Sequence, residues 1–322
     1  MLNLYAIREQ RLVRIDRVTD SREGLAWIDL LNPTAADEAE VEKLLGLGIP
    51  TREEMVEIEV SSRLYKENDA LYMTASLLVG ADQPMPQTRP VSFILARGYL
   101  VTVRYSEPGV FYNFVKQAQK AESNHKTADE VFVGLIDAVI DRTADVLEKV
   151  SFEIDTLSAK VFQGDASNET TQSDYREVLR KLGRNGDLNS KARESLVSVG
   201  RLVNFLTAEC AQSHLSLYER TGTMKADIRS LTDHATYLSS SCVFLLDATV
   251  GLITIDQNNI IKIVSVVSVV IMPPTLIASI YGMNFRFMPE IDWQGGYPFA
   301  LGLMVASALG PMWYFRRRGW LR

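Results

Sequence analysis

The chain contains few of the side chains that disulfide frameworks and soft metals require. It has two cysteines and three histidines, and Cys210 and Cys242 form no Cys-x-x-Cys pair. The sequence therefore predicts neither a disulfide framework nor a zinc centre of the His/Cys type. It also lacks a Walker loop, a Rossmann glycine fingerprint, a His-Glu-x-x-His pair and a Gly-x-Ser-x-Gly elbow. We therefore expect neither an enzyme nor an organic cofactor.

Positive charge is also scarce in most of the chain. The formal net charge is −6, yet the segment after Lys262 holds five arginines and two acids, so the acidic excess lies in the first 262 residues. Binding to nucleic acid requires clustered Lys and Arg that displace counterions, and we expect no nucleic-acid partner. An acidic domain of this size suits a protein that handles cations.

Charge is absent altogether from two long apolar runs near the C-terminus. Ile263–Tyr281 has nineteen uncharged residues and Gly296–Phe315 has twenty, and each is long enough to cross ~30 Å of hydrocarbon as a helix. Three arginines at 316–318 follow the second run. The positive-inside rule then places both chain ends in the cytoplasm and the loop 282–295 outside. The sequence predicts two transmembrane helices in contact with membrane lipid.

The remainder of the chain predicts an α+β domain followed by long helices. Thr34 opens an acidic helix that ends near Gly46, and from Gly109 onward apolar residues recur every three or four positions. A turn is expected at 164–168, a second long helix over 174–218 with a weak point at 183–186, and another turn at 221–223. Alternating apolar runs predict strands at Leu2–Ile7, Leu12–Ile15, Leu25–Leu30, Leu71–Leu78, Val91–Leu95 and Tyr99–Arg104.

These patterns divide the chain into consecutive parts. An α/β domain is expected over 1–125 and a helical hairpin over 126–222, both cytoplasmic. One long helix, without proline until Pro273, is expected to continue into the first span. The later parts are this long helix (223–281), which includes the first span (263–281), the external loop (282–295), the second span (296–315) and a basic cytoplasmic tail (316–322).

Polar side chains line one face of the first predicted span. Ser265, Ser268, Thr275 and Ser279 carry hydroxyls, and together with Met272 they follow one another at steps of three or four residues, the period of one helix face in a bundle. Such a stripe either packs helices closely or lines a wet pore. Because two spans per chain cannot enclose a pore, the second interpretation requires an oligomer. Stepping backward in the same phase gives Ile261, Asn258, Thr254 and Asp247.

A short motif follows the first span. It reads Tyr281-Gly282-Met283-Asn284-Phe285, then Met288-Pro289-Glu290 and Trp293. This resembles the signature of the CorA family, Gly-Met-Asn directly after the first of two C-terminal spans. The likeness covers essentially the whole chain, with supporting stretches at Trp27-Ile28-Asp29-Leu30, Ile49-Pro50-Thr51-Arg52-Glu53-Glu54-Met55, Met272-Pro273-Pro274-Thr275 and Arg317-Arg318-Gly319-Trp320-Leu321.

The resemblance implies a funnel-shaped homopentamer in a bacterial inner membrane, with cytoplasmic N- and C-termini. It implies an influx channel for Mg²⁺, and also for Co²⁺ and Ni²⁺, driven by the membrane potential. Gly282, Met283 and Asn284 would form the external selectivity filter. Val264 falls where the family has an apolar constriction. Other positions that match the family's pore lining are Asp247, Asn258, Ile261, Met272 and Thr275.

The resemblance further implies that Mg²⁺ bound by cytoplasmic carboxylates closes the channel. Asp227 is the first candidate ligand, Asp233 the second, and Asp82 a candidate partner from the α/β domain, with an ordinary solvated acid as the alternative for each. One rival interpretation is a Zn²⁺ transporter of the ZntB subgroup, although those relatives depart from the Met-Pro-Glu flank that this chain keeps. A membrane-anchored sensor is another, but it leaves the polar stripe unexplained.

Overall fold

The computed structural model describes residues 1–15, 24–57, 59–120, 125–162, 172–210, 215–284, 288–289 and 293–320. They form two compact units, Met1–Leu246 and Asp247–Arg322. The helices are α1 (Ala35–Leu45), α2 (Arg52–Val56), α3 (Val60–Arg63), α4 (Gly109–Ala118), α5 (Ala128–Phe162), α6 (Gln172–Cys210), α7 (Leu215–Tyr281) and α8 (Gly296–Arg317).

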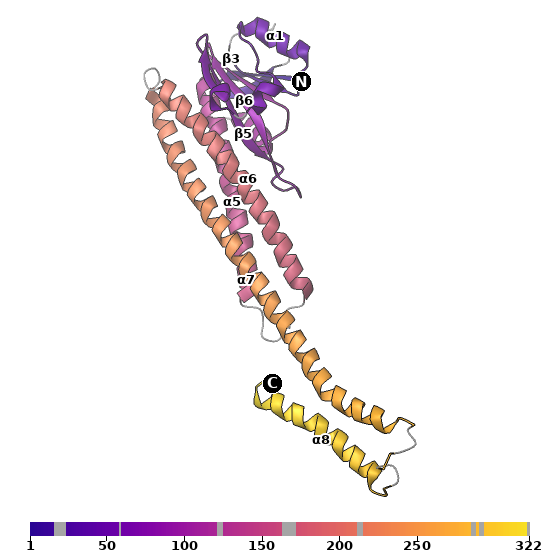
Figure 1. Cartoon of the computed structure of the whole chain (residues 1–322). Coiled ribbons are helices and arrows are strands. Elements are labelled where there is room, and N and C mark those ends of the chain that lie inside the picture. The colour runs from indigo at the N-terminus through magenta and orange to yellow at the C-terminus, as the bar shows by residue number, and fades with distance from the viewer. Residues whose placement is uncertain are drawn as a thin grey trace. The chain divides into compact units, whose positions relative to one another are not determined.

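A mixed sheet of seven strands builds the N-terminal part of the first unit (Figure 1). The strands are β1 (Leu2–Arg8), β2 (Arg11–Ile15), β3 (Leu25–Leu31), β4 (Leu64–Glu67), β5 (Ala70–Val79), β6 (Gln87–Ala96) and β7 (Tyr99–Arg104). Their order is β2-β1-β3-β7-β6-β5-β4. The central neighbours β3 and β7 pair in parallel, and the flanking pairs are antiparallel.

Helices cover both faces of this sheet. On one face Trp27, Phe93 and Leu100 belong to a core that also includes α4, α5, α6 and the N-terminal part of α7. On the other face Ile28 and Leu30 pack in a second core with α1 and α2. Every residue of β3 is buried, and a strand covered on both faces has a continuous apolar sequence rather than strict alternation.

The carboxyl end of the parallel pair β3–β7 holds a buried ion pair. Arg104 Nε and Nη2 each lie 2.8 Å from a carboxylate oxygen of Asp29, and the two side chains are 9% and 2% exposed. Thr102 Oγ1 and Asn3 Nδ2 donate to the same carboxylate at 2.8 and 3.2 Å. Arg104 Nη1 also donates to the Ser106 carbonyl at 3.1 Å, so this pair fixes the loop that leads into α4.

Most of the predicted elements are confirmed. The predicted strands correspond to β1, β2, β3, β5, β6 and β7. Helix α1 has the expected boundaries, because Thr34 and Asp37 form a capping box at its start and Gly46 ends it in the left-handed region at φ 67°. The α+β domain, the long helices and the two C-terminal apolar helices together confirm the predicted fold class.

Three details differ or lie outside the described residues. Strand β4 was not predicted. The turn predicted at Thr221-Gly222-Thr223 is wrong, since these residues belong to α7, and the 183–186 stretch lies inside an uninterrupted α6. The turn predicted at 164–168 lies outside the described residues.

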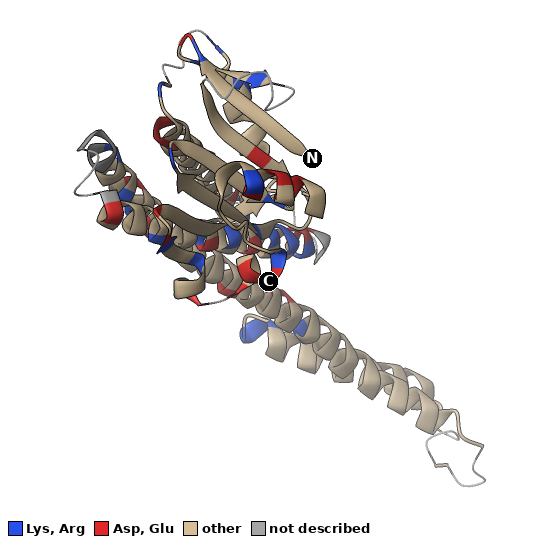
Figure 2. Ribbon diagram, turned by 90° about the horizontal axis from the view of Figure 1, so that it is seen from above, with Lys and Arg blue, Asp and Glu red and all other residues tan. Residues whose placement is uncertain are grey.

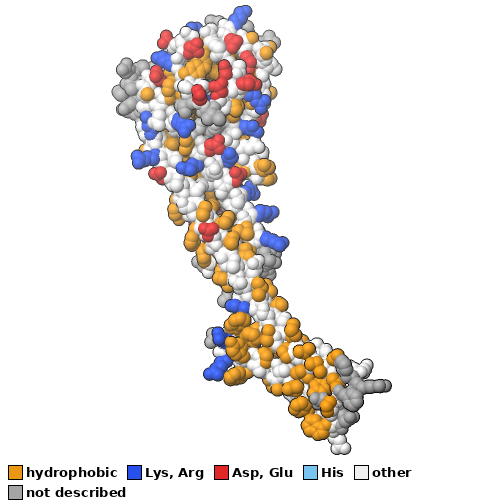
Figure 3. Space-filling view, in the orientation of Figure 1, with side chains coloured by type: hydrophobic (Ala, Val, Ile, Leu, Met, Phe, Trp, Pro, Cys, Tyr) orange, Lys and Arg blue, Asp and Glu red, His pale blue; other side chains and the backbone are white. Residues whose placement is uncertain are grey.

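The second unit consists of the C-terminal part of α7 and of α8. By length and composition these two helices can each cross a membrane. Hydrophobic side chains cover much of their visible surface in Figure 3. In Figure 2 most charged residues lie on elements of the first unit, whereas α8 is uncharged except at its basic C-terminal end.

Candidate functional site

The polar stripe lies on one continuous helix. Helix α7 is unbroken from Leu215 to Tyr281, so the three- and four-residue steps align the predicted positions along one face, with Val264 beside it. In the single chain all of them are exposed: Asp247, Thr254, Asn258, Ile261, Val264, Ser265, Ser268, Met272 and Thr275.

Hydroxyl groups on this stripe donate their protons to their own helix. Thr254 Oγ1 donates to the Val250 carbonyl at 2.9 Å, Ser268 Oγ to the Val264 carbonyl at 2.9 Å, and Thr275 Oγ1 to the Ile271 carbonyl at 2.8 Å. A hydroxyl has one donor and two acceptor positions. With the proton engaged, each oxygen faces outward as an acceptor only, which suits the water shell of a cation because those waters donate.

Two prolines interrupt the backbone hydrogen bonding of α7 near its C-terminal end. Pro273 and Pro274 lie inside α7, and proline has no N–H to offer the carbonyl four residues earlier. The carbonyls of Val269 and Val270 therefore lose their regular helical donors. Within a membrane such carbonyls are tolerated where they meet protein or water, so this segment adds further acceptors near the stripe.

The Gly-Met-Asn motif begins where α7 ends. The Gly282 N–H still donates to the Ala278 carbonyl at 3.0 Å and the Met283 N–H to the Ile280 carbonyl at 3.2 Å, so both residues continue from the last turn of the helix. A Cβ at Gly282 would lie 3.2 Å from the Ala278 oxygen, which favours glycine there. Met283 and Asn284 are exposed. Phe285 and Glu290, quoted with the motif, lie outside the described residues.

A group of acids surrounds Asp227, the first regulatory candidate. Burial chiefly raises the pKa of Asp137, and the negative charges of Asp141 and Asp227 add to that rise. Burial likewise raises the pKa of Asp141, with further contributions from Asp145 and Asp227. Asp137 also accepts a 2.8 Å ion pair from Arg220 Nη2. Asp227 of α7 is thus electrostatically coupled to one acidic face of α5, whereas Asp233 is simply exposed.

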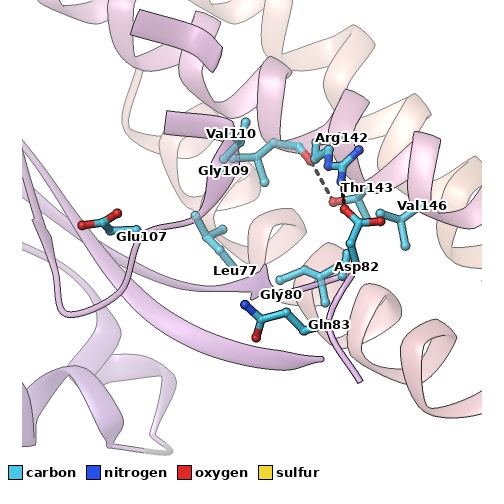
Figure 4. Close-up of a pocket in the computed structure, with 13 residues that line it drawn as sticks. Leu77, Gly80, Asp82, Gln83, Glu107, Gly109, Val110, Arg142, Thr143 and Val146 are labelled. Carbon is cyan, nitrogen blue, oxygen red and sulfur yellow. Dashed lines mark hydrogen bonds and ion pairs between the residues drawn. The ribbon is translucent and has the colours of Figure 1, made fainter. Parts of the chain in front are cut away.

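Asp82 faces cations rather than acids. Its carboxylate lies 3.1 Å from Arg142 Nη2 and 3.0 Å from Lys149 Nζ, and the hydrogen bond from Lys149 is the main cause of its lowered pKa. Figure 4 shows this side chain beside Arg142 in a cavity of about 270 Å³. Binding of Mg²⁺ by Asp82 would first require release of both cations.

No metal centre is preformed in the part of the chain that the structure describes. There, no group of three or more His, Cys, Asp or Glu side chains is arranged to hold a metal ion. Asp227 was predicted from the sequence, whereas Asp137 and Asp141 were not. Their four-residue spacing, continued at Asp145, was a usable signal because it places three carboxylates on one face of a helix.

Comparison with known proteins identifies the family. The family described as "CorA-like Mg2+ transporter protein" matches residues 22–317. The chain is 35% identical over 322 residues to the magnesium transport protein CorA of Pasteurella multocida (strain Pm70), covering 100% of each. The complete CorA magnesium transporter from Methanocaldococcus jannaschii has the same fold, with a TM-score of 0.79 and 18% identity over 100% of this chain and 99% of that one.

A more distant structure bears on the ZntB interpretation. The ZntB cytoplasmic domain from Vibrio parahaemolyticus RIMD 2210633 has a TM-score of 0.54 and 9% identity, covering 77% of this chain and 95% of that one. That likeness concerns the fold alone. The family match over most of the chain and the full-length identity to CorA proteins agree with each other. The chain therefore belongs to the CorA-like Mg²⁺ transporter family, whose members are ion transporters and not enzymes.

Proposed function

We propose that the chain forms a homopentameric Mg²⁺ influx channel in which five copies of α7 line the pore. The observation that carries this proposal is the exposed stripe on α7, where the hydroxyls of Thr254, Ser268 and Thr275 present acceptors, and which leads directly to the Gly-Met-Asn motif. A second copy of the chain is required because the described stripe residues have no enclosing partner within one chain. Gly282, Met283 and Asn284 act as the external filter.

The chemistry of this lining suits a hydrated hard cation. Mg²⁺ releases its water reluctantly, so amide and hydroxyl oxygens that accept from the water shell can select the hydrated ion without removing it. Thiolate and imidazole ligands, which favour softer metals, are absent from the stripe positions Asp247 to Thr275. The same outer-shell recognition extends to hydrated Co²⁺ and Ni²⁺. The apolar side chains of Ile261, Val264 and Met272 provide a constriction that closes by dewetting.

The membrane potential supplies the driving force. The arginines at 316–318 support cytoplasmic N- and C-termini in a bacterial inner membrane. A divalent ion moving inward gains about 4.6 kcal/mol per 100 mV of inside-negative potential, twice the value for a single charge. That energy supports a gradient of about 2,000-fold at equilibrium, so no ATP-binding site is needed.

Closure by cytoplasmic Mg²⁺ fits the acidic surroundings of Asp227. Burial chiefly raises the pKa values of Asp137 and Asp141, and repulsion among Asp227, Asp137 and Asp141 adds to both rises. A divalent cation relieves this repulsion, and an ion that binds the closed state more tightly shifts the population toward it. Carboxylates from a neighbouring subunit complete the ligand set, since the described residues of one chain form no group of three or more metal-binding side chains.

The deciding experiment measures Mg²⁺ entry into proteoliposomes under an inside-negative potential. Wild-type protein and Asn284→Ala are compared with the matched control Asn259→Ala. Asn259 is also an exposed asparagine, but it lies on α7 outside the stripe positions. We expect potential-driven uptake in wild type and in the control, and its collapse in Asn284→Ala. Equal uptake in all three proteins would reject the filter assignment.

The same assay separates the ions. Replacing external Mg²⁺ by Co²⁺, Ni²⁺ or Zn²⁺ tests selectivity directly. Uptake of the first two supports recognition of the hydrated ion. If the protein instead carried Zn²⁺ and no Mg²⁺, the ZntB interpretation would replace the one proposed. Absence of flux for every ion would favour a membrane-anchored sensor.

A further inference from the structure

A cationic cavity within the first unit is lined by residues of α6, by Ser76 of β5, by Arg63 at the end of α3 and by Ser239 of α7. Its volume of about 550 Å³ is that of a small-molecule site. Its lining includes Arg63, Arg193 and Arg201. Arg193 and Arg201 come from one face of α6, where they lie about two turns apart. Its lining contains no residue of the stripe and none of the acids around Asp227.

Several hydrogen bonds make this cavity a built feature of the fold. Ser198 Oγ of α6 accepts the Ser76 N–H of β5 at 2.8 Å, which holds the helix against the sheet edge. Arg63 Nε donates to the Glu57 carbonyl, and Nη2 donates to the Val56 carbonyl at 3.4 Å. These two bonds to backbone carbonyls hold the Arg63 guanidinium in place and leave its Nη1 free to donate to a ligand.

The positive charge of the cavity is only partly neutralised from within, because Glu194 is the one acid in its lining and interacts electrostatically with Arg63. Among the described residues, no carboxylate lies within ion-pair distance of Arg63, Arg193 or Arg201. Glu194, the acid in the lining, already accepts from Thr88 Oγ1 at 2.8 Å and from Lys191 Nζ at 3.1 Å. Three arginines against one acid leave an excess of two positive charges, in a chain whose net charge is −6.

Hydroxyl groups add further donors to the same space. The Ser198 hydroxyl accepts a hydrogen bond but donates none to another described residue. The hydroxyl of Ser190, on the same helix, also donates to no described residue. A serine hydroxyl carries one proton to donate. The cavity thus presents guanidinium and hydroxyl donors with few acceptors opposite them, and a donor excess of this kind favours binding of an anion.

We propose that this cavity binds a phosphate-bearing small anion, either a nucleotide or an inorganic polyphosphate. Guanidinium groups bind phosphate oxygens with paired, charge-assisted hydrogen bonds, and a phosphate chain offers enough oxygens to engage several arginines at once. The excess of two positive charges matches a multiply charged anion better than a single carboxylate. The proposal does not depend on ion transport, because it concerns a binding site in the first unit, Met1–Leu246.

The test titrates the full-length protein in lipid nanodiscs with ATP and, separately, with inorganic tripolyphosphate, using calorimetry. EDTA is present so that Mg²⁺ does not complex the anions. The variant R193Q/R201Q removes two arginines of the cavity. The matched control R180Q/R184Q removes two exposed arginines of the same helix that do not line it. All four positions are exposed, so the variants are expected to fold and to keep the oligomeric state of wild type.

We expect wild type and the control to bind with equal affinity, and R193Q/R201Q to bind at least about tenfold more weakly. Binding should also weaken as salt is raised. Binding of ATP alone would assign a nucleotide, and equal binding of both anions would assign the phosphate chain. The proposal is overturned if neither anion binds wild type, as when carboxylates of a second copy fill the cavity, or if both double variants weaken binding equally.

Discussion

Loss of Arg104 should destabilise the first unit by an amount that depends on the charge it leaves behind. In Arg104→Met the Asp29 carboxylate stays buried with donors from Thr102 and Asn3 but without its bidentate cation. Breaking a buried ion pair from one side costs roughly 3–5 kcal/mol, mainly because the remaining charge is uncompensated. Methionine fills a similar volume, so the loss of packing is a smaller part of the cost.

This free energy corresponds to a measurable change in melting temperature. At about 2.1 cal/mol/K per residue, the unfolding entropy of the first unit, Met1–Leu246, is about 0.5 kcal/mol/K. The expected fall in the apparent melting temperature is therefore roughly 6–10 °C. Differential scanning fluorimetry of the full-length protein in detergent measures it. Arg8→Met is the control, since Arg8 is an exposed arginine on β1 and its replacement should change stability by less than about 0.5 kcal/mol.

The double variant D29N/R104M tests the reasoning itself. Asparagine at position 29 removes the stranded charge and keeps one oxygen that can accept from Thr102, although its amide nitrogen is a donor and cannot replace the oxygen that accepts from Asn3. Because removal of the charge outweighs the loss of that one hydrogen bond, this variant should melt above Arg104→Met by at least about 2 °C. The two substitutions would then be strongly non-additive, as expected for contacting residues. A double variant that is destabilised by the sum of the two single effects would refute the argument, because the cost would then come from packing and not from charge.

Three further predictions concern the pore, the regulatory acids and pH. Thr275→Val should lower Mg²⁺ flux into proteoliposomes by about tenfold because it removes an acceptor oxygen, whereas Thr275→Ser should retain the flux. Asp227→Asn should raise the internal Mg²⁺ concentration that half-closes the channel by about 5-fold or more, and an unchanged value would exclude Asp227 from the site. Burial lowers the pKa of His125 below its usual 6.5, so the unfolded state binds more protons and stability should fall as pH drops below about 6.5. His125→Phe should remove that part of the pH dependence of the melting temperature.

Local signals were sufficient to predict most of the sheet and α1 from the sequence. The capping box at Thr34 and the glycine at 46 act within a few residues, so they can be recognised without a structure. Strand β4 has only four residues and is half exposed. It exists through its partner β5, where Tyr65 stacks on Tyr72 with ring centroids 4.6 Å apart. A contact of that kind is not visible in a short sequence window.

The wrong turn at 221–223 has a similar cause. Threonine and glycine have low helix propensity, so Thr221-Gly222-Thr223 suggested a break. In the structure Thr221 is fully buried and Met224 is 2% exposed. Burial of these side chains in the first core offsets the low propensity and carries α7 through the segment.

The predicted pore positions depend on what surrounds them, which one chain does not contain. The three- and four-residue spacing of the stripe along α7 could be recognised in the sequence. The structure adds that the hydroxyls of Thr254, Ser268 and Thr275 donate to their own helix and retain only acceptor capacity. In the single chain Ile261, Val264 and Met272 are 62%, 59% and 68% exposed. The polar residues between them, Ser265 and Ser268, are exposed as well. Hydrocarbon lipid would accept the apolar side chains but offers no donor to the oxygens of Ser268 and Thr275. Because polar and apolar positions share one face, the stripe is better satisfied against other copies of α7 around water than against lipid.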